Sequence, residues 1–177
     1  ACADQRSTSR PELLFVANFA PWHGLDVLLD AVSQSQEDFI LHLVGSIPQW
    51  LDGFLQDSRI RIHSKLNHTQ IALLSERCWI GLSSFALSRK HMKQACPLKS
   101  REYWMLGLPA YGDYAESLPV QVPYYQRGTE SMASILSFAR DMRQHSKEQV
   151  SRTMRPHIDK ISLLAKLYQA LCLDVVR

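Results

Sequence analysis

The side chains of this chain that could do chemistry are mostly basic, and they gather in segments that follow short apolar runs. The basic members of the set are His23, Lys65, Arg89, Lys90 and Lys99. One carboxylate, Glu102, lies close to the last of them in the sequence. Cations can neutralise a diphosphate, and a carboxylate accepts hydrogen bonds from the paired hydroxyls of a ribose. The combination indicates a site for a nucleoside diphosphate.

Apolar runs of strand length alternate with segments of helical periodicity over most of the chain. The predicted strands span 13–19, 39–45, 60–64, 79–85 and 108–114, and the predicted helices span 24–34, 48–57, 67–78 and 98–107. Asn67 is a natural N-cap for the third of these helices. Parallel neighbouring strands need crossover helices, so the alternation predicts an α/β, Rossmann-like fold with a parallel sheet and helices on both faces.

The two ends of the chain differ from this alternating region. Residues 1–12 are polar and lack periodicity, so we expect a linker there and a single Rossmann-like domain over 13–177. Helical spacing returns in 130–142 and 161–176, separated by the polar stretch 143–157. Two or three closing helices, forming a helical C-terminal tail, are therefore expected.

The composition narrows the class of protein. A length of 177 residues with 46% hydrophobic content fits one well-buried domain. The formal net charge is only +3 and the basic residues are spread out, so a dedicated nucleic-acid binder is not indicated. The four cysteines form no CxxC pair, which argues against a zinc site or a disulfide framework and favours a reducing cytoplasm. No apolar run reaches the roughly 18 residues of a membrane span, so we expect a soluble protein.

The loops after the predicted strands lack the glycine signatures of two large enzyme classes. Ligands of an open α/β sheet bind outside the carboxyl ends of its strands. Neither GxGxxG nor GxxxxGK[ST] occurs there, so the usual sequence evidence for a dinucleotide oxidoreductase or a P-loop kinase is missing. A receiver-like or flavodoxin-like domain would need an aspartate after its third strand or a flavin loop flanked by aromatic residues, and the sequence has neither.

The segment ACPLKSREYWMLGLP places a helix start and a carboxylate close together. The predicted helix starts at Pro97, Leu98 and Lys99, and this helix start offers the positive dipole end and the backbone N–H groups, which proline itself lacks, that suit a phosphate. Glu102 lies one turn further along, so its carboxylate can point back toward the strand ends. Two ordinary explanations stay open. The helix start can be one that binds nothing, and Glu102 can be an exposed residue paired with Lys99 or Arg101.

Four segments, taken in order, resemble a known family. They are LLFVANFAPWHGLDVLLDAV, FILHLVGS, RIRIHSKLNHTQIALLSERCWIGLSSF and PLKSREYWMLGLPAYGDY. Together they are similar to the C-terminal, donor-binding half of retaining GT-B-fold glycosyltransferases, and they most resemble the bacterial family 4 enzymes that build surface polysaccharides. The resemblance runs from about Leu13 to the final helix and is most specific at PLK-x-x-E-Y-x-x-x-G-L-P.

The resemblance implies an activity and its partners. Such an enzyme moves a sugar from a nucleotide diphosphate sugar to a glycan or lipid-linked acceptor, with no metal or other cofactor. Its acceptor site belongs to an N-terminal domain that is absent from the present chain, so we expect this chain to bind donor and to catalyse little alone. The implied location is the cytoplasm, with peripheral association of the full-length protein with the inner face of the membrane.

The resemblance also implies roles for single residues. Glu102 grips the ribose of the donor. Asn18 and His23 stand where family members commonly carry an arginine and a lysine that neutralise the pyrophosphate, and Gly24 permits close backbone approach. A neutral imidazole can still donate one hydrogen bond to a phosphate. The alternative for His23 is a loop histidine that packs on Trp22.

Gln94 is the main departure from the family pattern. The family has two glutamates eight residues apart, and the first of them, beside the transferred sugar, is replaced here by Gln94. The amide keeps hydrogen-bonding capacity and loses the negative charge. Gln94 and His23 are accordingly the residues expected to act nearest the chemistry, and stabilisation of the departing phosphates is expected to supply much of the catalysis.

Other loop residues are expected to contact the donor. Lys65 and Leu66 follow the third predicted strand, and Arg89 and Lys90 follow the fourth. Arg89 and Lys90 could supply the phosphate charge that the first loop lacks, and solvated loop charges are the alternative.

Two other functions are compatible with the sequence. A non-catalytic nucleotide-sugar-binding module would share the pocket and tolerate the missing first acid. A nucleotide-sugar epimerase of the same fold would form product with no acceptor present.

Overall fold

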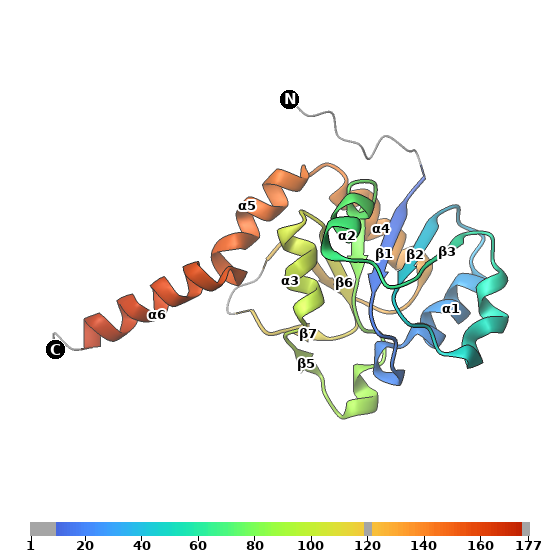
Figure 1. Cartoon of the computed structure of the whole chain (residues 1–177), viewed down its shortest axis with the longest axis horizontal. Coiled ribbons are helices and arrows are strands. Elements are labelled where there is room, and N and C mark those ends of the chain that lie inside the picture. The colour runs from blue at the N-terminus through green and yellow to red at the C-terminus, as the bar shows by residue number, and fades with distance from the viewer. Residues whose placement is uncertain (1–9, 119–121, 175–177) are drawn as a thin grey trace.

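Six strands form one parallel sheet in the computed structural model, which describes residues 10–118 and 122–174 (Figure 1). The order across the sheet is β3, β2, β1, β4, β6, β8. Every neighbouring pair is parallel, with Leu13 of β1 opposite Leu41 on one side and Ile80 on the other. The bounds are β1 Glu12–Val16, β2 Ile40–Val44, β3 Ile60–His63, β4 Ile80–Leu82, β6 Ala110–Gly112 and β8 Tyr125–Arg127. The predicted Rossmann-like sheet is confirmed.

Helices follow the strands as crossover connections and then close the chain. The α-helices are α1 Leu25–Gln34, α2 His68–Ser75, α3 Leu98–Met105, α4 Met132–Met142, α5 Lys147–Ile158 and α6 Lys160–Asp174. Three 3-10 helices are η1 Pro21–His23, η2 Gln49–Gln56 and η3 Leu87–Lys90. The Asn67 side chain accepts from the Gln70 N–H at 2.9 Å, and the Gln70 side chain accepts from the Asn67 N–H, so the predicted N-cap of α2 is part of a capping box.

The helices cover both faces of the sheet because successive strand residues point to opposite sides. Leu13 and Phe15 of β1 pack in one buried cluster with residues of α1 and α4. Leu14, between them, packs in a second cluster with Tyr103 of α3 and Val150 of α5. Burial on both faces explains why the strands read as continuous apolar runs.

Three segments differ from expectation. The predicted helix over 48–57 is the 3-10 helix η2, in which Leu51 is the buried residue and Gly53 removes a side chain from the middle. The polar stretch 143–157 holds most of α5, where Ser146 accepts from the Gln149 N–H and Val150 and Met154 are buried one turn apart, so α4, α5 and α6 confirm the expectation of two or three closing helices. Strand β8 lies in a segment for which we predicted no strand.

The two ends of the described chain behave differently. Of the predicted linker 1–12, residues 1–9 lie outside the described part, whereas the Pro11 carbonyl already accepts from the Ile40 N–H at 2.8 Å and β1 begins at Glu12. At the other end, α6 extends away from the sheet beyond α5 (Figure 1). Its exposed apolar side chains are Ile161, Leu163, Leu164, Leu167, Tyr168 and Leu171. Among the described helices, none has both the length and the apolar content needed to cross a membrane.

Candidate functional site at the carboxyl edge of the sheet

The candidate site lies where the strand order reverses. β2 and β3 lie on one side of β1, whereas β4, β6 and β8 lie on the other. In open α/β sheets the crevice at such a reversal, outside the carboxyl ends of the strands, is the usual place for a ligand. The loops after β1 and β4 border this crevice. They carry six of the predicted residues, namely Asn18, His23, Gly24, Arg89, Lys90 and Gln94.

These two loops are bonded directly to each other. The Phe85 N–H donates to the His23 carbonyl at 2.9 Å. Gly24 has a φ of 68°, and a Cβ at this position would lie 2.8 Å from the Phe85 carbonyl carbon. Glycine is therefore needed at position 24 for its left-handed backbone and for the neighbouring loop. The close approach expected at Gly24 is made by the protein's own backbone, and its contact with a donor stays a prediction.

His23 is held as a neutral hydrogen-bond donor. Its Nδ1 accepts from the Ala20 N–H at 2.9 Å, so the ring proton is on Nε2. Burial, together with the positive charges of Lys99 and Lys90, lowers the pKa of His23 to about 4. The ring lies 5.7 Å from the Trp22 ring, so the packing alternative is partly realised as well. At neutral pH the group that His23 can offer a ligand is therefore an N–H.

The start of α3 brings backbone and side-chain donors to the crevice. Its N-cap, Pro97, makes no side-chain capping bond, and Leu98 is exposed. The Lys99 ammonium nitrogen is buried and has no hydrogen-bond partner among the described residues. It lies 5.1 Å from the Phe15 ring centroid. Burial lowers the pKa of Lys99 to about 7, against the opposing effect of the Glu102 charge.

Glu102 is exposed and does not make the pairings that would explain it as a surface residue. Arg101 instead donates to Glu116 at 3.1 Å, and Lys99 makes no hydrogen bond within the described chain. Among the described residues, the Glu102 carboxylate has no hydrogen-bond or ion-pair partner. Its acceptor oxygens are available to a ligand, and its contact with a ribose stays a prediction.

The residue after Glu102 fixes α3 on the sheet. The Tyr103 hydroxyl accepts from the Val16 N–H at 2.9 Å and donates to the Leu82 carbonyl at 3.1 Å. Val16 ends β1 and Leu82 ends β4, so this hydroxyl bridges the two strands at the reversal. The predicted carboxylate is thereby tied to the crevice through its neighbour.

A second set of hydroxyls, which the sequence pattern does not indicate, lies beneath the start of α3. The Tyr114 hydroxyl lies 2.7 Å from Ser83 Oγ and 2.9 Å from Ser100 Oγ, and all three residues are buried. Ser83 follows β4 and Ser100 lies in the first turn of α3, so the network fastens the helix start to the strand. Serine and tyrosine carry no spacing signal for such a contact, because the partners are 14 and 31 residues apart.

The basic residues after β4 are partly engaged within the protein. Arg89 makes two hydrogen bonds to the Asp26 carboxylate, at 2.7 and 3.0 Å, and a third to the Pro21 carbonyl at 2.7 Å. The Lys90 ammonium lies 3.6 Å from the Trp22 ring centroid, where a cation–π contact holds it. Arg89 thus connects η3 to α1, and the phosphate contact expected of it would require that ion pair to rearrange.

Gln94 is exposed and lies on a short second sheet. Strand β5, Gln94–Ala95, pairs in parallel with β7, Ala115–Glu116. The Ala115 N–H donates to the Lys93 carbonyl at 2.9 Å, and the Ser117 N–H donates to the Ala95 carbonyl at 3.0 Å. The loop that carries Gln94 is therefore anchored to the segment after β6.

Lys65 and Leu66 lie at the same edge of the sheet but further from the reversal. They follow β3, which is separated from β1 by β2. Lys65 is exposed, whereas Leu66 is half-buried against the second apolar cluster. A donor would have to extend along the sheet edge to reach them.

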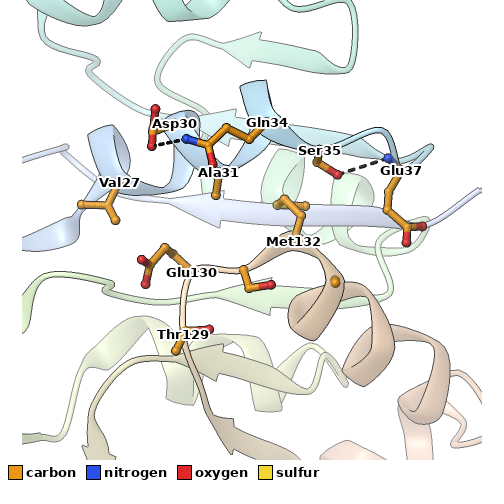
Figure 2. A pocket seen from close by; sticks show the side chains of 11 residues that line it. Val27, Asp30, Ala31, Gln34, Ser35, Glu37, Thr129, Glu130 and Met132 are labelled. Atoms are coloured by element: carbon orange, nitrogen blue, oxygen red, sulfur yellow. Dashed lines mark hydrogen bonds between the residues drawn. The ribbon is translucent and has the colours of Figure 1, made fainter.

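A separate groove lies between α1 and the start of α4 (Figure 2). Its volume is about 560 Å³, and its polar lining includes Asp30, Gln34, Glu37 and Glu130. The Gln34 amide donates to Asp30 at 2.8 Å, and Glu37 accepts from Arg140 at 2.7 Å. None of the residues predicted from the sequence lines this groove.

The comparisons with known proteins give similarity at the level of structure. No family model and no curated protein matches the chain. The apo form of the lipopolysaccharide outer core galactosyltransferase WaaB has a TM-score of 0.64 and 10% identity, over 88% of this chain and 47% of that one. Anabaena HepE in complex with UDP-glucose has a TM-score of 0.65 and 14% identity, over 93% and 49%. A Rickettsia africae glycosyltransferase has a TM-score of 0.67 and 16% identity, over 92% and 47%.

The present chain therefore spans about half the length of each of these solved chains. Identities this low carry information about architecture alone. TM-scores of 0.64 to 0.67 over 88% to 93% of this chain show that the architecture is shared. The chain has the Rossmann-like fold of one half of a GT-B glycosyltransferase.

Proposed function

We propose that this chain is the donor-binding half of a retaining glycosyltransferase, with a nucleotide diphosphate sugar bound across the crevice between β1 and β4. The observation that carries the proposal is that three neighbouring groups at this crevice have no hydrogen-bond partner within residues 10–118 and 122–174. They are the His23 Nε2–H, the buried Lys99 ammonium and the exposed Glu102 carboxylate. Two donors and one acceptor of this kind match a diphosphate joined to a ribose. Support also comes from HepE, which shares the fold and is described in complex with UDP-glucose.

In the proposed chemistry, the main task of this half of the enzyme is to stabilise the leaving group, the nucleoside diphosphate. Transfer with retention passes through an oxocarbenium-like transition state while the bond to the diphosphate breaks. Negative charge then accumulates on the phosphate, where the uncapped start of α3 and the Lys99 ammonium would stabilise it. Glu102 would hold the ribose. Gln94 would hydrogen-bond a hydroxyl of the transferred sugar as a neutral amide.

The acceptor is proposed to bind a second domain that faces this one. The solved chains that match the present chain are about twice as long as it, which supports a two-domain arrangement. We propose a family 4 type of enzyme that acts in the cytoplasm on a glycan or lipid-linked acceptor of surface-polysaccharide synthesis, at the inner face of the membrane. The present chain alone should then bind donor with little or no turnover.

Calorimetric titration of the purified chain with UDP, GDP, ADP and dTDP tests the proposal. We expect at least one nucleoside diphosphate to bind and the corresponding nucleoside to bind far more weakly, because the crevice recognises the phosphates. Circular dichroism checks that the fold is intact. A folded chain that binds none of the four would contradict the proposed function.

A second candidate is a non-catalytic nucleotide-sugar-binding module. The observation that favours it is that Gln94 lacks the negative charge of the family's first acid. The full-length protein separates the possibilities when it is incubated with the nucleotide sugar. Product that needs an acceptor indicates a transferase, and product without an acceptor indicates an epimerase. Binding without turnover indicates the module.

A further inference from the structure

Lys99 presents an unusual group in the crevice. Its ammonium nitrogen is buried, yet it makes no hydrogen bond to any residue of the described chain. An ammonium has three donors, and burying it without partners is costly unless something else compensates. A lysine that only covered apolar surface with its stem would extend its head into water.

The surroundings of this ammonium explain how it is held in the free protein. Its nitrogen lies 5.1 Å from the centroid of the Phe15 ring, and that ring makes edge contacts with Phe19 at 5.0 Å and Phe85 at 6.1 Å. Phe19 and Phe85 lie in the loops after β1 and β4, so the ammonium enters the gap between those two loops. The aromatic face attracts the cation weakly and supplies no acceptor.

The charges around Lys99 are unbalanced. His23 on η1 and Lys90 on η3 face the same gap, and both can carry only positive charge. Glu102, on α3 itself, is the acidic residue that acts on Lys99, and it makes no hydrogen bond to the ammonium. Arg89 is already neutralised by Asp26. The described part of the crevice thus has cationic and N–H groups in excess of acceptors.

We propose that Lys99 is the principal cation for the donor's diphosphate, and that it replaces in this chain the basic residues expected where Asn18 and His23 stand. This proposal rests on the proposed function and names the group that carries it. The ammonium and the His23 Nε2–H would bind oxygens of the diphosphate from opposite sides of the gap. Lys99 would then be charged in the complex and partly neutral in the free protein.

This change in the protonation of Lys99 on binding can be measured, and a merely structural lysine would not show it. Burial lowers the pKa of Lys99 to about 7 in the free protein. A neighbouring diphosphate favours the charged amine and raises that pKa, so binding at pH 8 takes up a proton. His23 cannot be the group that takes up this proton, because its pKa of about 4 in the free protein would have to rise far more than the pKa of Lys99. Affinity is expected to fall as the pH rises from 7 to 9.

The test uses calorimetry at pH 8 in two buffers of different ionisation enthalpy, with UDP, GDP, ADP, dTDP and inorganic pyrophosphate as probes. We expect proton uptake by the wild-type chain and loss of that uptake in Lys99→Met. Affinity for the bound probe should fall about tenfold or more in Lys99→Met, which corresponds to one charge-assisted hydrogen bond. Lys160→Met, which removes an exposed lysine of α6, should change affinity less than about twofold.

The outcomes separate this proposal from the function on which it rests. If the wild-type chain binds a probe, and Lys99→Met binds it equally with the same proton uptake, the role of Lys99 is overturned and the donor site stands. If the wild-type chain binds none of the probes, both proposals are overturned. Should Lys99→Met fail to fold, proton uptake by the wild-type chain still decides, since binding without uptake at pH 8 contradicts the proposal.

Discussion

The ring of Tyr103 occupies the space that a side chain at position 81 would need. A Cβ on Gly81 would come within 2.3 Å of that ring. Gly81 lies in the middle of β4 and Tyr103 lies in α3, so the missing side chain lets the helix lie directly on the strand. This contact places the Tyr103 hydroxyl between β1 and β4 and leaves Glu102 at the crevice.

Gly81→Ala should destabilise the fold by about 1 to 3 kcal/mol, because the added methyl group forces α3 away from β4. Urea unfolding measures the change. Gly53→Ala in η2 is a matched control, since a Cβ there would meet nothing within 4 Å. Equal effects in the two variants would show that the Tyr103 ring is not the reason for the glycine.

Tyr103→Phe should cost about 1 to 3 kcal/mol of unfolding free energy, because the Val16 N–H and the Leu82 carbonyl both lose a buried partner. Tyr168→Phe, on the exposed part of α6, should stay within about 0.5 kcal/mol of the wild type. Denaturant unfolding of both variants, monitored by circular dichroism, is the measurement. A Tyr103→Phe protein as stable as the wild type would mean that water replaces the hydroxyl.

Glu102→Gln should weaken binding of a nucleoside diphosphate by about 1.5 to 3 kcal/mol, because a charged acceptor for the ribose hydroxyls becomes a neutral amide. Calorimetry on folded protein measures the loss. Glu76→Gln changes another exposed carboxylate, after α2, and should leave binding as it was. Unchanged affinity in Glu102→Gln would remove the ribose assignment.

Gln94→Glu should lower donor affinity or turnover by roughly tenfold in a protein that carries the acceptor domain as well, since one unbalanced charge interaction of about 1.4 kcal/mol would act on the donor phosphates. Steady-state kinetics and calorimetry measure the two effects. A gain in turnover would instead mean that the amide marks a decayed site, and the preferred assignment of Gln94 would be wrong.

A chain of hydrogen bonds, buried at Glu12 and His42, joins β1, β2 and β3. The Glu12 carboxylate accepts two hydrogen bonds from Arg77, at 2.6 and 2.9 Å, and lies 2.8 Å from His42 Nε2. His42 Nδ1 lies 3.0 Å from His63 Nε2. Burial lowers the pKa of both histidines. Burial alone would raise the pKa of Glu12, but the hydrogen bonds from Arg77 and His42 lower it overall.

Acid should therefore destabilise the protein. Below a pH of about 6.5 the unfolded chain binds protons that the folded histidines do not, so stability falls as the pH drops. Glu12 adds to the loss as the pH falls below about 4.5, because its folded pKa is lower than its unfolded one. Urea unfolding at pH 8, 7, 6 and 5 measures the slope. His42→Gln should reduce the slope of unfolding free energy against pH. His68→Gln, at an exposed position, should keep the wild-type slope. Equal slopes in the wild type and both variants would contradict this account.

The regular part of the fold could be predicted from local pattern, and the small strands could not. α1 follows from apolar residues at helical spacing, and Asn67 marks the start of α2 by the chemistry of its side chain. β8 has three residues, two of them exposed, and β5 and β7 have two each. Segments this short have no periodicity, so they depend on neighbours that the sequence does not reveal.

Some features of the candidate site could likewise be predicted from local sequence, and others could not. The position of Glu102 on a helix near the strand ends follows from ACPLKSREYW alone. The engagement of Arg89 by Asp26 does not, because 63 residues separate the partners. Nor does the buried state of Lys99, which depends on how the loops after β1 and β4 meet over Phe15. Sequence thus predicts which groups are present, and long-range packing decides which of them are unpaired.

The pairing of β5 with β7 has a consequence for altering donor choice. Residues 93–95 and 115–117 are hydrogen-bonded to each other, so a shift of one stretch carries the other with it. For a donor sugar that lies at Gln94, the shape of its subsite is therefore encoded in two distant parts of the chain. Grafting a new sugar preference requires exchange of both stretches together.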